Sequence, residues 1–483
     1  METKQIMIIG MGFHARRIYI PRIIDYSKNM PIKLSCGVDL ISQSNSINEY
    51  ISTNKYSFEP VYLDNFDIEK GLTKEITQLL NSLVKKHSIS GVIISTEPLT
   101  HKVYAEWALE NGLHILMDKP ISIRNRVNTD QFQAEALIDD YTELLSLYNE
   151  ASVKKDLAFT VNVQRRYDKG FDEVIRLITE TKDKFNIPVT SIQAMHADGT
   201  WVFPKELLDQ ESHPYKYGYG KCAHSGYHIF DMIWQFYKAG SVTKKKADTL
   251  EVFSSQLNPS GFNTCISEED YSQYFGSLYE STGLSREEYE NKVEDYGELD
   301  SFSILRLLKD GENICNISVS LLHSSFSRRS WATPDKDLYK GNGRVKHQQF
   351  IIQQGPFQSI HIHNYQSKHQ HDVDNSDEFS VGGNNHFDIY VFRNVAMFGE
   401  GKSFYKISSK ELESKNAQGL TIENVKGEVI LEFLNFMLGK ICKKDLKSNI
   451  DTHYVPVKIL SGIYQSNVKL KNKQNPLIKI KLE

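Results

Sequence analysis

A glycine turn between an apolar strand and a helical segment constrains this chain more than any other feature. Residues 5–9 form a short apolar run, and Gly10-Met-Gly-Phe-His-Ala15 follows it directly. Gly10 permits a tight turn, Gly12 lets a ligand approach the backbone, and the small Ala15 lets a helix pack on the strand. We therefore predict a βαβ unit whose turn binds a phosphate group. The alternative interpretation is a glycine turn in an unrelated α/β fold.

An acidic residue ends the next apolar stretch. Ile32 to Val38 is predicted to form the second strand, and Asp39 follows it. A carboxylate at this position accepts hydrogen bonds from a ribose, and Leu40 and Ile41 offer no cation for a 2′-phosphate. The pattern favours NAD over NADP, with a solvated strand-end carboxylate as the alternative.

Strands and helices alternate in the first part of the chain. Two further strands are predicted at 91–95 and 114–117, and two helices at 74–86 and 100–111, while 40–72 looks loop-rich. This alternation is typical of a parallel sheet with right-handed crossovers. We predict a Rossmann domain over 1–125.

The pattern changes after that point. A long helix (129–154), a strand (157–163) and a second helix (169–181) lead into stretches that alternate with period two. These stretches are 189–197, 302–308, 314–322, 347–353 and 358–365, followed at the end of the chain by a helix over 455–467 and a strand over 477–482. Period-two patterning predicts strands. We expect residues 126–483 to form an α/β domain with a large, mainly antiparallel sheet and a long insertion around 241–450, within which 241–300 and 366–386 look irregular.

Composition excludes several classes of protein. The formal net charge of -4 over 483 residues gives no basic excess for nucleic acid. No apolar run approaches the roughly 18 residues of a membrane span. Five scattered cysteines without a Cys-x-x-Cys pair indicate neither a disulfide framework nor a zinc site, and together with the lack of room for a signal peptide they favour the cytoplasm.

Several short motifs along the chain resemble those of one known protein family. Thr96-Glu-Pro98-Leu-Thr-His101 and Asp118-Lys-Pro120 resemble its Thr-x-Pro turn and its Glu-Lys-Pro tripeptide, with aspartate in place of glutamate. Arg165-Arg-Tyr167 resembles its Arg-Arg-aromatic turn. His224-Ser-Gly-Tyr-His228-Ile-Phe-Asp231 resembles its Asp-x-Gly-x-His-x-x-Asp segment, with His224 at the first aspartate. The family that these motifs resemble is the Gfo/Idh/MocA family of oxidoreductases, and the similarity covers about 1–240 and 453–483.

The resemblance implies an NAD-dependent dehydrogenase that acts on a hydroxyl or ketone of a sugar, a sugar nucleotide or a cyclitol. Lys119 would stabilise developing charge on the reacting oxygen, and His228 would take and return its proton. The implied cofactor contacts are Gly10, Gly12, Phe13, His14, Asp39, Thr96, Pro98, His101, Asp118 and Lys119. Arg166, Tyr167, His224 and His228 would bind substrate. The family's exposed sheet face implies a homo-oligomer, a dimer or a tetramer.

Other interpretations stay open. A glycosidase that retains NAD and a non-catalytic dinucleotide-binding regulator both fit the same motifs. The spacing of His224 and His228 is also compatible with two zinc ligands, but no third ligand is evident. A second cluster (His361, His363, His369, His371 and Asp372) lacks fixed metal-ligand spacing, so we expect no metal.

Overall fold

The computed structural model describes residues 2–211, 213–332, 343–367, 386–408, 411–412 and 422–482. The chain divides into two compact units. The first consists of Met1–Ile123, Leu137–Asp168 and Gly419–Val457, and the second of Arg124–Ala136, Lys169–Gln418 and Lys458–Glu483.

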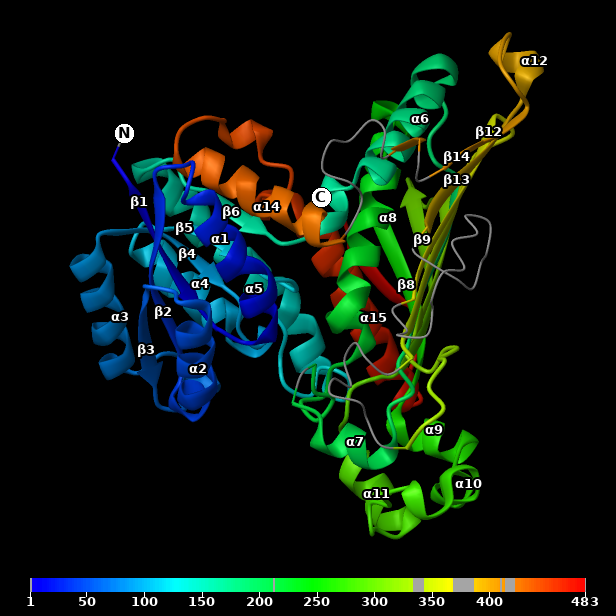
Figure 1. Cartoon of the computed structure of the whole chain (residues 1–483). Helices are drawn as coiled ribbons and strands as arrows, with labels where there is room; N and C mark the ends of the chain where they lie inside the picture. Colours follow the sequence, from blue (N-terminus) through cyan, green and yellow to red (C-terminus); the bar gives the residue numbers. More distant parts are fainter. Residues whose placement is uncertain are drawn as a thin grey trace. The chain divides into compact units, whose positions relative to one another are not determined.

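The first unit is built on a six-stranded parallel sheet in the order β3-β2-β1-β4-β5-β6 (Figure 1). Its strands are β1 Lys4–Ile9, β2 Ile32–Leu40, β3 Glu59–Leu63, β4 Ile89–Ile94, β5 His114–Met117 and β6 Phe159–Val161. The helical elements include η1 Ala15–Tyr19, α1 Ile20–Tyr26, α2 Ser44–Asn54, α3 Lys74–His87 and α4 His101–Glu110. The predicted Rossmann-type sheet is confirmed, and α2 and β3 occupy the stretch that looked loop-rich.

The first unit is not the continuous segment 1–125. The predicted strand at 157–163 forms β6, which pairs in parallel with β5 and so extends the first sheet. Helix α14 (Ile422–Met437) brings Val429, Phe433 and Met437 into the same core as Ile6 and Ile8. The core of this unit therefore needs residues from distant parts of the sequence.

The second unit contains a nine-stranded sheet in the order β14-β13-β12-β11-β7-β10-β9-β8-β15. Its strands are β7 Ser191–Gly199, β8 Thr249–Leu257, β9 Asp300–Lys309, β10 Glu312–Leu322, β11 Val345–Gln354, β12 Gln358–Ser367, β13 His386–Arg393, β14 Phe404–Ile407 and β15 Ile478–Lys481. Strands β7 and β10 pair in parallel, and the other neighbours pair antiparallel among the residues described. The mainly antiparallel sheet is confirmed.

Helices cover one face of this second sheet. Helices α6 (Lys169–Phe185) and α8 (Tyr227–Ala239) run along that face in Figure 1. The region 241–450 is not a single insertion, because it supplies seven of the sheet's strands (β8 to β14) as well as α14. The stretch 241–300, which looked irregular, holds β8 and the helices α9 Pro259–Cys265, α10 Glu268–Phe275 and α11 Arg286–Val293.

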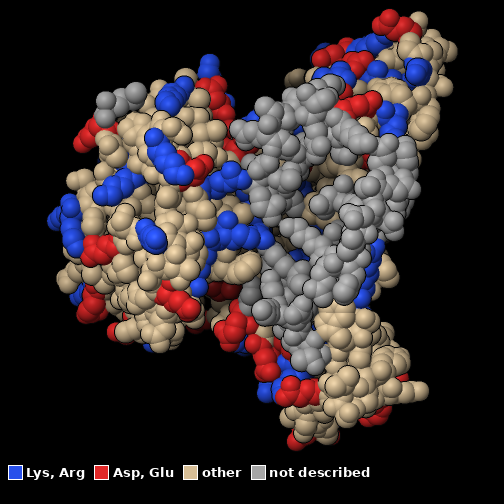
Figure 2. Space-filling model, viewed as in Figure 1, with Lys and Arg blue, Asp and Glu red and all other residues tan. Residues whose placement is uncertain are grey.

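The surface carries both signs of charge. On the face of the first unit that Figure 2 shows, Lys and Arg side chains are interspersed with Asp and Glu. Among the described residues, no helix is both long enough and apolar enough to cross a bilayer.

Candidate active site

The glycine turn lies between the carboxyl ends of β1 and β4. The Gly10 amide donates to Val38 O over 2.9 Å, and Gly10 has a φ of +88°. A Cβ at this position would lie 2.4 Å from Ser95 O, so only glycine fits. At Gly12 a Cβ would meet no atom within 4 Å, which leaves open space beside the backbone. This arrangement fits a turn that admits a phosphate group.

Asp39 folds back onto this turn from the end of β2. Its Oδ2 accepts from the Met11 amide over 2.5 Å, and its Oδ1 accepts from the Leu40 amide over 2.7 Å. Burial raises the pKa of Asp39, while these amides and the Arg16 guanidinium act in the opposite direction. The sequence suggested no cation here, but Arg16 is close enough to act on Asp39, and its Nε donates to Met11 O over 2.7 Å.

Asp118 anchors the loop that follows β5. Its Oδ1 accepts from Tyr19 Oη over 2.5 Å and from Asn162 Nδ2 over 3.0 Å, and its Oδ2 accepts from Ser95 Oγ over 2.9 Å. His14 Nε2 lies 3.9 Å from Oδ1. Although burial opposes ionisation, His14 and the hydrogen bonds lower the pKa of Asp118 to about 2. The carboxylate therefore fixes the backbone immediately before Lys119.

His14 and Phe13 occupy different environments although they adjoin in sequence. Burial lowers the pKa of His14 to about 4, so its imidazole is neutral near pH 7. Phe13 is 53% exposed, and the Arg17 guanidinium lies 5.6 Å from its ring centroid. Phe13 is therefore available to a ligand at the turn.

His101 ties the loop after β4 to the loop after β5. It is fully buried, its Nδ1 donates to Pro120 O over 2.7 Å, and its Nε2 lies 3.3 Å from Thr96 O. The peptide bond between Lys119 and Pro120 is cis. Thr96 precedes the 3₁₀ turn Pro98–Thr100, and its Oγ1 accepts a hydrogen bond over 2.7 Å from Oγ1 of Thr100 at the end of that turn. His101 thus contacts the backbone of both loops.

Arg166 and Tyr167 also make internal contacts within the first unit. The Arg166 Nη1 donates to Lys447 O over 2.7 Å and to Thr452 Oγ1 over 2.6 Å. The Tyr167 hydroxyl donates to Glu432 on α14 over 2.5 Å. These side chains bind the returning segment 419–457 to the parallel sheet.

His224 and His228 lie in the second unit, where helical residues 222–226 lead into α8. The His224 ring lies edge-on to Tyr215, Tyr219 and His213, with centroids 5.0–5.4 Å apart. His228 is 7% exposed. One helical face therefore presents both imidazoles.

The two described members of the remaining histidine cluster, His361 and His363, lie on β12. His361 Nε2 lies 3.0 Å from Ser359 Oγ, and His363 faces Tyr390 with ring centroids 5.7 Å apart. His369, His371 and Asp372 lie outside the described residues. Within the described part of the chain, no group of three or more His, Cys, Asp or Glu side chains is arranged to hold a metal ion.

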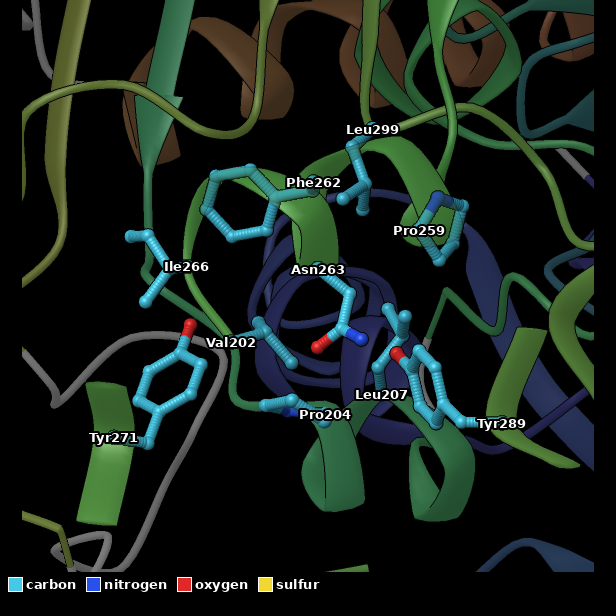
Figure 3. Close-up of a pocket in the computed structure, with 10 residues that line it drawn as sticks. All are labelled: Val202, Pro204, Leu207, Pro259, Phe262, Asn263, Ile266, Tyr271, Tyr289 and Leu299. Carbon is cyan, nitrogen blue, oxygen red and sulfur yellow. The ribbon is translucent and has the colours of Figure 1, made fainter. Parts of the chain in front are cut away.

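A separate small cavity lies among the helices of the second unit (Figure 3). Its volume is about 10 Å³, the space of a single water molecule. Its lining is mostly apolar, and its polar groups are the Asn263 amide and the hydroxyls of Tyr271 and Tyr289. The cavity is too small for a sugar.

The first part of the chain matches the model of a known protein family. Residues 4–140 match the family model GFO_IDH_MocA, an oxidoreductase family with an NAD-binding Rossmann fold. The match confirms the predicted resemblance to the Gfo/Idh/MocA family and the NAD-binding fold to which the glycine turn pointed, whereas the preference for NAD over NADP that Asp39 suggested stays a prediction.

Solved structures share the fold over the whole chain. An oxidoreductase domain protein from Kribbella flavida is 12% identical, with all of both chains covered and a TM-score of 0.61. Levoglucosan dehydrogenase in complex with NADH and L-sorbose is 13% identical over all of both chains, with a TM-score of 0.59. An Agrobacterium radiobacter oxidoreductase in complex with NAD⁺, L-tartaric acid and magnesium is 11% identical over 99% of this chain and 98% of its own, with a TM-score of 0.57. No curated protein sequence matches this chain.

The structure also shows site residues that the sequence patterns did not single out. From η1, Arg16 contacts Met11 in the glycine turn and Tyr19 contacts the predicted residue Asp118, which Asn162 also contacts from the segment after β6. Glu97 lies inside the Thr96–His101 motif, and its place directly before Pro98 was the one available signal.

Proposed function

We propose that this chain is an NAD-dependent dehydrogenase or reductase for a CH–OH group of a sugar, a sugar nucleotide or a cyclitol. The observation that carries the proposal is the NAD-binding family match over 4–140, which contains Lys119, two residues after the end of β5. Similarity in fold to levoglucosan dehydrogenase and to scyllo-inositol dehydrogenase from Lactobacillus casei supports the substrate class.

The residues of the first unit fit a bound dinucleotide. Gly10 and Gly12 would receive the pyrophosphate, Asp39 a ribose hydroxyl, and the loops of Thr96, Pro98 and Asp118 the nicotinamide end. Bound NAD supplies the acceptor for the hydride that leaves the carbinol carbon.

Lys119 and His228 carry the rest of the chemistry in this proposal. The Lys119 ammonium stabilises negative charge on the substrate oxygen as its proton leaves. His228 receives that proton on an imidazole nitrogen and returns it in the reverse direction. His224 and the second unit would contribute substrate contacts.

The test is a panel of sugars, polyols and cyclitols monitored at the NADH absorbance, with wild type and with Lys119→Ala and His228→Ala. Each variant should lose about 100-fold or more in kcat, because each removes one group acting on the reacting oxygen. Lys85→Ala, an exposed lysine on α3, is the matched control and should retain activity. Unchanged turnover in both active-site variants would refute the assignment, and NAD binding without turnover on any compound would favour a regulatory role.

We also propose that the protein assembles as a homo-oligomer through the sheet face opposite α6 and α8. Phe302 and Ile304 on β9 are 53% and 56% exposed, and Phe392 and Phe404 on β13 and β14 are 40% and 49% exposed. Exposed apolar side chains gathered on one face favour a protein partner. The five free cysteines support a reducing, cytoplasmic setting.

A further inference from the structure

Glu97 is a titratable group at the dinucleotide edge to which the proposed chemistry gives no role. It lies three residues after the end of β4 and directly before the turn Pro98–Thr100. The side chain is mostly buried, and its Oε1 has no hydrogen-bond partner among the described residues. A buried oxygen without a partner is costly unless a ligand or a water satisfies it.

The position of Glu97 places it beside the cofactor residues. Strand β4 lies between β1 and β5, and Ile94 pairs with Met117 in parallel register. The residues that follow these strands therefore share one edge of the sheet with the glycine turn. The Lys119 ammonium is close enough to act on the Glu97 carboxyl.

We propose that Glu97 is a further cofactor-contacting residue, whose carboxyl group in its protonated form donates a hydrogen bond to an acceptor oxygen of the bound dinucleotide. The inference rests on the dinucleotide site proposed above. A neutral carboxyl offers an O–H donor, whereas a carboxylate offers acceptors alone and would add negative charge beside an acceptor oxygen of the cofactor.

Electrostatics support the neutral form. Burial raises the pKa of Glu97 to about 8, and the opposing effect of Lys119 is too small to restore its ordinary value. Near pH 7 the carboxyl is therefore mostly protonated.

The titratable groups near Glu97 have pKa values well away from that of Glu97. The pKa of Asp118 is about 2, that of His14 is about 4, and burial lowers that of His101. Burial and Asp118 raise the pKa of Tyr19 well above its ordinary value. Lys119 is the remaining charged group facing Glu97, and it is left in place when Glu97 alone is changed.

Proton linkage follows from a donor that must stay protonated. Dinucleotide binding should raise the proton affinity of Glu97, so affinity should be constant below the pKa of the free form and fall above it. The Kd should rise by up to about tenfold for each pH unit above 8. At pH 8, where the free carboxyl is half ionised, binding should take up about half a proton.

Calorimetric titration of NAD into the full-length protein tests this inference without turnover. Wild type is titrated at pH 7, 8 and 9 in two buffers with different ionisation enthalpies, so that proton uptake is measured separately from binding. Glu97→Gln keeps a donor and cannot ionise, so its Kd should be similar at all three pH values, with no uptake at pH 8. Glu110→Gln, which removes an exposed carboxylate at the end of α4, is the matched control and should behave like wild type.

The outcomes separate the two proposals. If wild type binds NAD with equal Kd at pH 7 and 9 and takes up no proton, the role of Glu97 is refuted while the dinucleotide site stands. An equal pH dependence in wild type and Glu97→Gln assigns the titration to another group and also refutes it. If wild type does not bind NAD at any pH, the dinucleotide site itself fails.

Discussion

Substitution by alanine should lower the stability of the fold at Gly10 and the affinity for NAD at Gly12. At Gly10 an added Cβ would lie 2.4 Å from Ser95 O, and the φ of +88° disfavours any other residue. The backbone conformation costs about 1–2 kcal/mol and overpacking about 1–3 kcal/mol more. Gly10→Ala should therefore lose about 2–5 kcal/mol of unfolding free energy, or about 4–20 °C in Tm for a unit of this size.

At Gly12 the same methyl group meets no neighbour within 4 Å and requires no unusual φ. Gly12→Ala should therefore keep its stability to within about 0.5 kcal/mol. Because the methyl group enters the space that a pyrophosphate would occupy, its Kd for NAD should rise at least about tenfold.

Thermal melts of the ligand-free variants, followed by NAD titration of each, measure both effects. A Gly10→Ala protein as stable as wild type would refute the close approach to Ser95. A Gly12→Ala protein that binds NAD as wild type does would refute the placement of the cofactor at this turn.

Three further outcomes follow from the same structure. Because the pKa of Asp118 lies below its ordinary value of 3.8, its ionisation stabilises the fold above about pH 4; about 2 kcal/mol should be lost between pH 4 and 2, and acid titration of Asp118→Asn should show no such step. Asp39→Ser should improve NADP binding relative to NAD, because it removes the negative charge and leaves Arg16 nearby; unchanged selectivity in paired titrations would contradict this role. Ile304→Arg should shift the protein to a smaller species in light scattering, whereas Leu278→Arg, at a 68% exposed site away from the sheet, should not; a monomeric wild type would rule out the oligomer.

Local pattern was sufficient where a residue's role depends on its immediate neighbours. The apolar run before Gly10 and the acid after Val38 placed the turn and the ribose-binding candidate correctly at the ends of β1 and β2. The half-buried edge strand β3 and helix α2, with Ile47 as its one buried residue, carry too weak an apolar signal to predict.

Contacts between segments that are far apart in the chain could not be predicted from the sequence. Arg166 stays a predicted substrate ligand, and the structure adds that its guanidinium binds Lys447 and Thr452, which no spacing rule connects to it. The residues that follow Asp39 offered no cation, and Arg16, which lies near it in the fold, belongs to the crossover between β1 and β2. Pairing of this kind is decided by tertiary packing and is absent from local periodicity.

The return of residues 419–457 to the first unit has a consequence for how the protein is made. Val429, Phe433 and Met437 complete a core begun by Ile6 and Ile8, so that core cannot close until most of the chain has left the ribosome. Contacts of such long sequence separation slow folding, because a large loop must be closed before they form. A nascent or truncated chain ending near residue 125 should expose this apolar surface and depend on chaperones, although it carries the whole glycine turn.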